Sequence, residues 1–197
     1  MEEFQFAGSS PLDTRSVLLV EGVSDQVAVE TLAARLGRNL ASEGVTVMPM
    51  GGAHAMGRIL SGLGVPGASM RLAGLYDVGE ERVVRGALRR AGLGAGSSLT
   101  RTDMEDLGFY VCVVDLEDEL IRAVGASSVL TVVDSQGEID SFHTLQKQPA
   151  WRGRRLEEQL RRFLGNGSRK ARYARLLVES LDPSQAPRPL RLLLARV

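Results

Sequence analysis

The chain has 197 residues, 44% of them hydrophobic and 24% charged, which is the composition of a globular protein large enough to bury a core. No apolar run approaches the roughly 20 residues that cross a bilayer, and the acidic N-terminus lacks the layout of a signal peptide. The single cysteine, Cys112, excludes an internal disulfide and lies in an apolar run, which favours a buried thiol over a nucleophile. We therefore expect a cytoplasmic protein with no membrane partner.

The net charge is zero, but the charges are unevenly distributed along the chain. Residues 1–140 contain 11 Lys and Arg against 20 Asp and Glu, whereas residues 141–197 contain 13 against 4. An acidic pocket beside a basic surface suits an enzyme that holds metal ions and a polyanion together. We predict a lead-in over residues 1–16, a central domain over 17–140 and a basic helical extension over 141–197.

The first predicted element is a short strand over Val17–Val20, buried on both faces and followed at once by Glu21. Ser24 or Asp25 can then cap a helix over about residues 26–36. A carboxylate at the end of a central parallel strand lies where open α/β sheets bind ligands. Glu21 and Asp25 in one pocket would repel each other unless a proton or a cation lay between them, and a hard divalent cation such as Mg²⁺ is the usual solution. The alternative is a solvated Glu and an ordinary helix cap.

Three further strands are predicted downstream, over residues 45–48, 71–76 and 109–114. Each leads into a predicted helix, over about residues 54–63, 80–91 and 115–124. This alternation indicates an α/β fold with a mainly parallel four-stranded sheet. The third and fourth strands end in acids, Asp77 and Asp115, as the first ends in Glu21. Parallel strands bring such ends to one edge, which predicts a metal site; the alternative is that the acids cap the helices.

Glycines interrupt the chain at two places between these elements. Gly51 and Gly52 follow the second strand and let a backbone or a ligand approach closely, whereas Gly92–Ser98 reads as a flexible connector. His54, after the glycine pair, is interpreted as a surface helix residue, and His143 as structural because it lacks a partner at metal-ligand spacing.

The basic tail is predicted to form helices over about residues 154–164 and 170–181 and a short last helix, packed on the sheet with their arginines outward. Trp151, beside a proline, is interpreted as a packing residue at a hinge rather than a base-stacking platform. Several arginines are candidates for a phosphate-binding face, against the alternative of an ordinary solvated surface: Arg152, Arg154, Arg155, Arg161, Arg162 and Arg169.

Four segments in this order, VLLVEGVSD, MGG, LYDVGEE and VCVVDLEDEL, resemble the TOPRIM domain of the OLD-family ATP-dependent endonucleases. The tail segments LQKQPAW and RKARYARLLVESL resemble that family's helical extension, so the resemblance spans about residues 17–194. It implies a Rossmann-like TOPRIM catalytic domain over residues 17–140. It further implies cleavage of DNA phosphodiester bonds with two Mg²⁺ or Mn²⁺ ions.

The resemblance also implies roles for individual residues. It assigns the metal ions to two groups of carboxylates: Glu21 and Asp25, with Asp77 shared or adjacent, and then Asp115 and Glu117. It assigns catalytic roles to Glu21 and to Lys170, which would face the scissile phosphate and neutralise developing charge. A solvated lysine at a helix start is the alternative for Lys170.

Two features depart from the family pattern. The D-x-D motif appears as Asp77-Val78-Gly79, so its second Asp is missing, and Glu80 or Glu81 would have to substitute. The family normally carries an ABC-type ATPase ahead of the TOPRIM domain, but this sequence has no G-x-x-x-x-G-K-[ST] loop and only 16 residues before the first strand. We therefore expect a stand-alone TOPRIM protein or one that works with a separate ABC-type ATPase; a homodimer stays open.

Three functions are compatible with these residues. The first is a metal-dependent nuclease or nicking enzyme that acts on DNA. The second is a module that binds metal and nucleic acid, or a partner ATPase, without cutting, and Gly79 favours it. The third is nucleotidyl transfer, although no template-handling domain is recognisable.

Overall fold

The computed structural model describes residues 15–63, 70–94 and 99–197. These residues form one parallel sheet in the order β2-β1-β3-β4, which confirms the predicted α/β fold. Its strands are β1 (Ser16–Val20), β2 (Val45–Pro49), β3 (Arg71–Asp77) and β4 (Phe109–Cys112). The chain adds β2 on one side of β1 and then β3 and β4 on the other. The direction of winding therefore reverses between β1 and β3, and their carboxyl ends flank the crevice where such sheets bind ligands.

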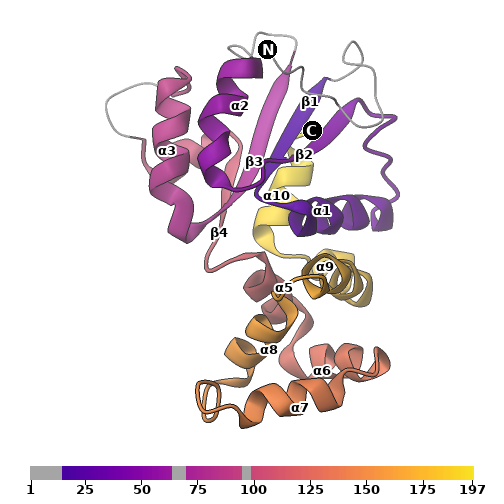
Figure 1. Ribbon diagram of the computed structural model, residues 1–197. Helices are drawn as coiled ribbons and strands as arrows, with labels where there is room; N and C mark the ends of the chain where they lie inside the picture. Colours follow the sequence, from indigo (N-terminus) through magenta and orange to yellow (C-terminus); the bar gives the residue numbers. More distant parts are fainter. Residues whose placement is uncertain (1–14, 64–69, 95–98) are drawn as a thin grey trace.

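Helices cover both faces of the sheet (Figure 1). One face carries α2 (Met56–Leu63) and α3 (Glu81–Arg90), and the other carries α1 (Val23–Arg35) and α10 (Arg188–Ala195). Side chains alternate along β1, so that Val17 and Leu19 join the core beneath α2 and α3, whereas Leu18 and Val20 join the core beneath α1. All four are fully buried, as predicted for a central strand.

A second group of helices gathers at the carboxyl ends of the strands (Figure 1): α5 (Leu116–Val124), α6 (Ala126–Ser135), α7 (Ile139–Lys147), α8 (Leu156–Leu164) and α9 (Arg169–Ser180). Helix α9 packs along α1, and α8 packs against α5, α7 and α9. The expectation that the tail helices pack on the sheet therefore holds for α10, which lies on β3 and β4, but is wrong for α8 and α9. The boundary predicted at residue 140 falls inside α7 and stays a prediction.

The start of α1 differs from the predicted one. The helix begins at Val23 because Gly22, in an extended conformation with φ −146° and ψ −178°, is its N-cap. Ser24 and Asp25 therefore lie in the first turn and do not cap the helix themselves. The Asp25 carboxylate instead accepts a hydrogen bond from the Gly22 N–H at 2.7 Å, which fixes this carboxylate beside the end of β1.

The end of β4 also differs, because the strand stops at Cys112 rather than at residue 114. Val113 and Val114 are 56% and 39% exposed, so their apolar character does not reflect burial in the sheet. The turn that they form leads into α5, whose predicted start and end are confirmed.

The sequence patterns do not predict several short helices. The helices α4 (Arg101–Asp106), α6 and α7 were not predicted, nor were the 3₁₀ turns η1 (Ala53–Ala55), η2 (Val78–Glu80) and η3 (Pro183–Gln185). The α6 sequence is rich in Ser and β-branched residues, which have low helix propensity. Tertiary packing stabilises this helix, since Val129 and Val133, one turn apart, are fully buried.

Two expectations fall partly outside the described residues: the lead-in as far as residue 14, and residues 95–98 of the glycine-rich connector. Within the described part of the chain, no helix combines the length and the apolar character that crossing a bilayer requires.

Candidate functional site

Glu21 stands at the mouth of the crevice, immediately after β1. Its backbone carbonyl accepts hydrogen bonds from the N–H groups of both Gly51 and Gly52 at 3.0 Å. These glycines have φ of 73° and 111°, a region that strains residues with a side chain. The glycine pair therefore turns the chain after β2 so that two N–H groups hold the end of β1, which is the close backbone approach that the sequence predicted.

The acids of the other two strands reach the same edge. Asp77 is the last residue of β3 and is in register with Cys112 of β4. Asp115 is the N-cap of α5, where one carboxylate oxygen accepts the Asp118 N–H at 2.9 Å. Its other oxygen accepts a hydrogen bond from Nε of Arg161, a residue of α8, at 2.5 Å. The α5 start thus joins the sheet edge to the helices that gather below it.

Glu117 and Lys170 form the inner wall of the site. Glu117, in the first turn of α5, is only 5% exposed. Lys170, in the first turn of α9, places its Nζ 3.6 Å from Oε1 of Glu117. Among the described residues that oxygen is buried and has no hydrogen-bond partner. A buried acceptor without a hydrogen bond is costly in an ordinary core, so this atom is fitted for a ligand or a cation.

The electrostatics show that these side chains face one another. Burial, then repulsion from Glu21, Asp25 and Asp115, raises the pKa of Asp77 to about 8, although Lys170 partly offsets this. Burial also raises the pKa of Glu117 to about 7, again against the opposing effect of Lys170.

Burial and the same neighbouring charges also shift the pKa values of Glu21, Asp25 and Lys170. Burial is the first cause that raises the pKa of Glu21 and of Asp25, and the neighbouring acids add to it. For Lys170, burial lowers the pKa, but Glu117 and the other acids outweigh it and raise the pKa overall. Five predicted metal-site carboxylates and the predicted lysine therefore share one region, and the acids outnumber the base.

The two acids considered as substitutes for the missing Asp of D-x-D are placed differently. Glu80 is close enough to contribute to the raised pKa of Glu21. Glu81 instead forms ion pairs with Arg85 and Arg101 on the side of α3. Gly79 lies between them and Asp77 in η2, and a Cβ atom at this position would meet no atom within 4 Å.

The acids do not form a finished metal cage. Across residues 15–63, 70–94 and 99–197, no three His, Cys, Asp or Glu side chains are grouped as they would be around an ion. Mg²⁺ nevertheless binds commonly through one or two carboxylates and several waters. The donor set of carboxylates, the raised pKa of Asp77 and the Glu117 oxygen that accepts no hydrogen bond fit a hard divalent cation.

Residues 14–70 match the family model described as the TOPRIM domain of overcoming lysogenization defect (OLD) protein-like proteins. The chain is also similar to the C-terminal region of the OLD protein of Xanthomonas campestris pv. campestris, in the structure phased with platinum. The two share 24% sequence identity with a TM-score of 0.69, over 94% of this chain and 93% of that one. The C-terminal region of the Burkholderia pseudomallei OLD protein gives 21% identity and a TM-score of 0.66, over 92% of this chain and 96% of that one.

The chain has the fold of an OLD-family TOPRIM region. The resemblance inferred from its sequence is thus confirmed, and TOPRIM domains generally bind divalent metal ions. No curated protein matches the sequence.

A cleft of about 440 Å³ opens beside Asp115 and Glu117 at the carboxyl edge of the sheet. One wall contains Asp115, Glu117 and Lys170, and the other comes from α8 and the loop before it. That second wall consists of Trp151, Arg154, Glu158, Arg161, Arg162 and Gly165. The acidic site and a basic surface therefore meet in one cleft, as the charge distribution of the sequence suggested.

The predicted phosphate-binding arginines divide into two sets. Arg154, Arg161 and Arg162 line the cleft. The other three have different partners: Arg152 donates to the Lys147 carbonyl, Arg155 pairs with Glu157 and Arg169 pairs with Glu138. The sequence could not separate these sets, because the partners of an arginine depend on the neighbouring helices.

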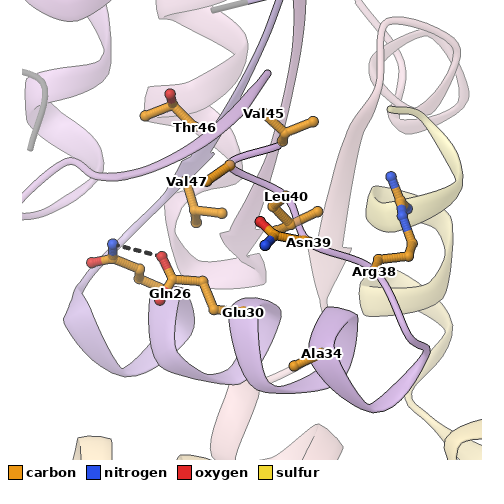
Figure 2. Close-up of a pocket in the computed structure, with 10 residues that line it drawn as sticks. Gln26, Glu30, Ala34, Arg38, Asn39, Leu40, Val45, Thr46 and Val47 are labelled. Carbon is orange, nitrogen blue, oxygen red and sulfur yellow. Dashed lines mark hydrogen bonds between the residues drawn. The ribbon is translucent and has the colours of Figure 1, made fainter. Parts of the chain in front are cut away.

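A second hollow, of about 370 Å³, lies between α1 and β2 (Figure 2). Gln26 and Glu30 on α1 are joined across one helical turn by a hydrogen bond of 2.9 Å. Arg38, at its far end, is engaged by Glu43 and by two backbone carbonyls near the C-terminus. Because these charged groups already have partners, we do not regard this hollow as the functional site.

Two of the remaining candidates, Cys112 and His54, behave as the sequence indicated, whereas the structural role expected for His143 stays a prediction. Cys112 is buried, and burial raises the pKa of its thiol well above the ordinary value, so it is not a reactive nucleophile. His54 and His143 are both exposed on helices.

Proposed function

We propose that this protein is a metal-dependent phosphodiesterase that cuts or nicks DNA. The observation that carries the proposal is the excess of carboxylates over cations at the carboxyl edge of the sheet: burial and mutual repulsion raise the pKa of Asp77 to about 8. A site that gathers more acids than cations, with a buried carboxylate oxygen of Glu117 that accepts no hydrogen bond, is suited to divalent cations.

The carboxylates would divide the cations between them. Glu21, Asp25 and Asp77 would hold one ion, and Asp115 and Glu117 would hold the other. Paired Mg²⁺ or Mn²⁺ ions would supply electrophilic stabilisation of the phosphate and activation of a water. Asp115 already accepts a hydrogen bond from Arg161 Nε at 2.5 Å, so an ion held there would compete with Arg161 for this carboxylate.

Lys170 and the arginines would bind the substrate. The Lys170 ammonium group lies in the cleft beside Glu117 and can donate a hydrogen bond to a phosphate oxygen in place of the 3.6 Å ion pair. Arg154, Arg161 and Arg162 offer further donors along the same cleft, where they can bind phosphates on either side of the scissile one.

A second function has a specific observation in its favour. Gly79 occupies the position of the second Asp of D-x-D, and the described residues hold no preformed group of three metal ligands. A module that binds metal and nucleic acid, or a separate ABC-type ATPase, without cutting would tolerate both features. A cytoplasmic location and pairing with a second copy of the chain stay predictions.

A nicking assay on supercoiled plasmid with Mg²⁺ or Mn²⁺ tests the proposal. We expect the wild-type protein to convert supercoiled DNA to open-circular or linear forms. Glu21→Ala and Lys170→Ala should each reduce the rate by about 100-fold or more, because the first removes a proposed metal ligand and the second removes the positive charge beside the reacting phosphate. Arg175→Ala is the matched control, since Arg175 lies on α9 like Lys170 but pairs with Glu179 outside the cleft.

The two functions give different results in this assay. An inert wild-type protein that still shifts DNA in a gel would support the non-cutting module. Cutting that survives both substitutions would come from a contaminant or another site and would contradict the proposed roles.

A further inference from the structure

Trp151 is the only tryptophan of the sequence, and it lies outside both hydrophobic cores of the described residues. Large aromatic side chains are usually among the main contributors to a core. Trp151 instead lines the cleft that contains Asp115, Glu117 and Lys170. Because Trp151 belongs to neither core, the structure does not support its interpretation as a packing residue at a hinge. Its place in the cleft needs another explanation.

The backbone of Trp151 is firmly held. Its N–H donates to the Gln148 carbonyl at 2.9 Å, and its carbonyl accepts the side-chain amide of Gln159 at 2.8 Å. Gln159 is only 6% exposed, and its amide oxygen is bound in turn by Gln146 at 2.7 Å. A buried glutamine, hydrogen-bonded through both its amide nitrogen and its amide oxygen, thus fixes the loop that carries the ring, which lowers the entropy lost when a ligand stacks on it.

One arginine lies over the ring, and two more line the same cleft. The Arg162 guanidinium group lies 5.9 Å from the centroid of the indole ring, and Arg154 and Arg161 line the same cleft. Glu158, the acid of this wall, is 3.8 Å from Arg154 and so is partly neutralised. An aromatic ring among arginines is the combination with which proteins bind single-stranded nucleic acid: the ring stacks a base while the cations bind the backbone.

We propose that the cleft binds an unpaired nucleotide of a single-stranded DNA segment, with its base stacked on Trp151 and its phosphates on Arg161, Arg162 and Lys170. The inference rests on the proposed function, because it places this nucleotide beside the scissile phosphate. A base inside a duplex is stacked between its neighbours and cannot offer its face to the ring unless it is first unstacked and unpaired. The site therefore selects single strands, frayed ends or flaps over intact duplex.

Intrinsic fluorescence tests the inference directly, because all tryptophan emission comes from this one ring. The full chain is titrated with a single-stranded oligonucleotide, the blunt duplex of the same sequence and an abasic strand of equal length, without Mg²⁺ or Mn²⁺ so that no DNA is cut. We expect the single strand to quench the emission and to bind about tenfold or more tighter than the duplex or the abasic strand, since stacking contributes roughly 1–3 kcal/mol per base.

Substitutions of Trp151 are followed by the anisotropy of a labelled oligonucleotide. Trp151→Ala should remove the preference for the single strand, whereas Trp151→Phe should keep most of it because phenylalanine also stacks. His143→Ala, at an exposed position on α7 outside the cleft, is the control for the loss of a surface ring. Circular dichroism melts establish whether each variant is folded. If the Trp151→Ala protein is unfolded, the single-strand preference of the Trp151→Phe protein tests the stacking role instead.

Equal quenching and equal affinity for single strand, duplex and abasic strand would overturn the inference, as would unchanged single-strand affinity in a folded Trp151→Ala protein. If the plasmid is cut but these results appear, the base-stacking role fails while phosphodiester hydrolysis stands. If single strands quench the emission but no DNA is cut with either metal, hydrolysis fails while the binding role stands. A protein that binds no DNA contradicts both.

Discussion

The first two turns of α9 contact two groups of acids, and these are compensated to very different degrees. Glu138, at the start of α7, accepts hydrogen bonds from Arg169 at 2.9 Å, Arg172 at 2.7 Å and the Tyr173 hydroxyl at 2.9 Å. Lys170, between these residues in the sequence, approaches the acids at the sheet edge. One carboxylate thus has three donors, whereas five carboxylates share chiefly one lysine, with Arg161 on Asp115.

The pKa values express this difference. Burial alone would raise the pKa of Glu138, but the hydrogen bonds from Arg172, Arg169 and Tyr173 outweigh it and lower the pKa to about 2. At the sheet edge, burial and like charges prevail, and the pKa of Asp77 rises to about 8. An acid that the protein itself neutralises fastens helices together, whereas acids left without enough cations are suited to bind a ligand.

The largest effect should follow from removing a charge at the uncompensated acids. Asp77→Asn should reduce Mn²⁺ affinity and DNA cleavage by about 100-fold or more, because a ligand is lost. The same change should make the metal-free protein more stable at pH 9, since it removes repulsion from Glu21, Asp25 and Asp115. Calorimetric Mn²⁺ titration and urea unfolding measure the two effects. A variant that binds Mn²⁺ like the wild type would remove Asp77 from the metal site.

The opposite pattern is expected at the compensated acid. Glu138→Gln should destabilise the protein by about 1–2 kcal/mol, because charge-assisted hydrogen bonds from two arginines are weakened. This value allows for the partial exposure of the Glu138 side chain, which lets solvent screen the ion pairs. Mn²⁺ affinity should stay within about threefold of the wild type. Urea unfolding and calorimetry are again the measurements, and Glu179→Gln on the exposed face of α9 is the control. A large loss of Mn²⁺ affinity without loss of stability would show that the two acid groups are not independent.

A substitution of Gly79 should strengthen metal binding at the site. Gly79→Asp restores the second acid of D-x-D, and the backbone there has no positive φ and leaves open space for a side chain. We expect roughly tenfold tighter Mn²⁺ binding, because ion affinity rises with the number of charged ligands, and faster cleavage of supercoiled plasmid. Gly79→Asn is the uncharged control. Unchanged Mn²⁺ affinity in both variants would mean that η2 does not face the ion.

The stability should also depend on pH, with slopes of opposite sign in the two regions. Asp77 and Glu117 have ordinary pKa values of 3.8 and 4.5 that rise to about 8 and about 7 on folding. The folded state therefore holds protons that the unfolded state has released, and the stability of the metal-free protein should fall as the pH rises from about 4 to about 8.

For Glu138, whose pKa falls from 4.5 to about 2, the stability is present above about pH 4.5 and is lost as the pH falls toward 2. Urea unfolding at a series of pH values measures both slopes. Saturating Mg²⁺ should flatten the upper slope, and Glu138→Gln should flatten the lower one. If the fall in stability toward pH 8 were unchanged by Mg²⁺ and by Asp77→Asn, groups other than Asp77 would be responsible for it.

The sequence was sufficient for the strands and for the order of the acids along the chain. Four apolar residues before Glu21 predict a buried strand, and parallel strands place their ends at one edge wherever the helices lie. The sequence predicted less well the features that depend on a backbone conformation or on the tertiary packing of a short helix. Gly22 caps α1 through its extended backbone, and α6 is helical despite a β-branched sequence because Val129 and Val133 are buried.

By itself, the sequence determined the α/β fold, the edge at which Glu21, Asp77 and Asp115 meet and the separation of an acidic front from a basic tail, because these depend on local patterns. Only the tertiary structure decided which bases reach the acids. Lys170 faces Glu117, 53 positions earlier in the chain, because α9 packs along α1, whereas its neighbour Arg169 is bound by Glu138. It likewise brought Trp151 into the cleft, since the packing of helices, and not the spacing of residues, determines the contacts between distant side chains.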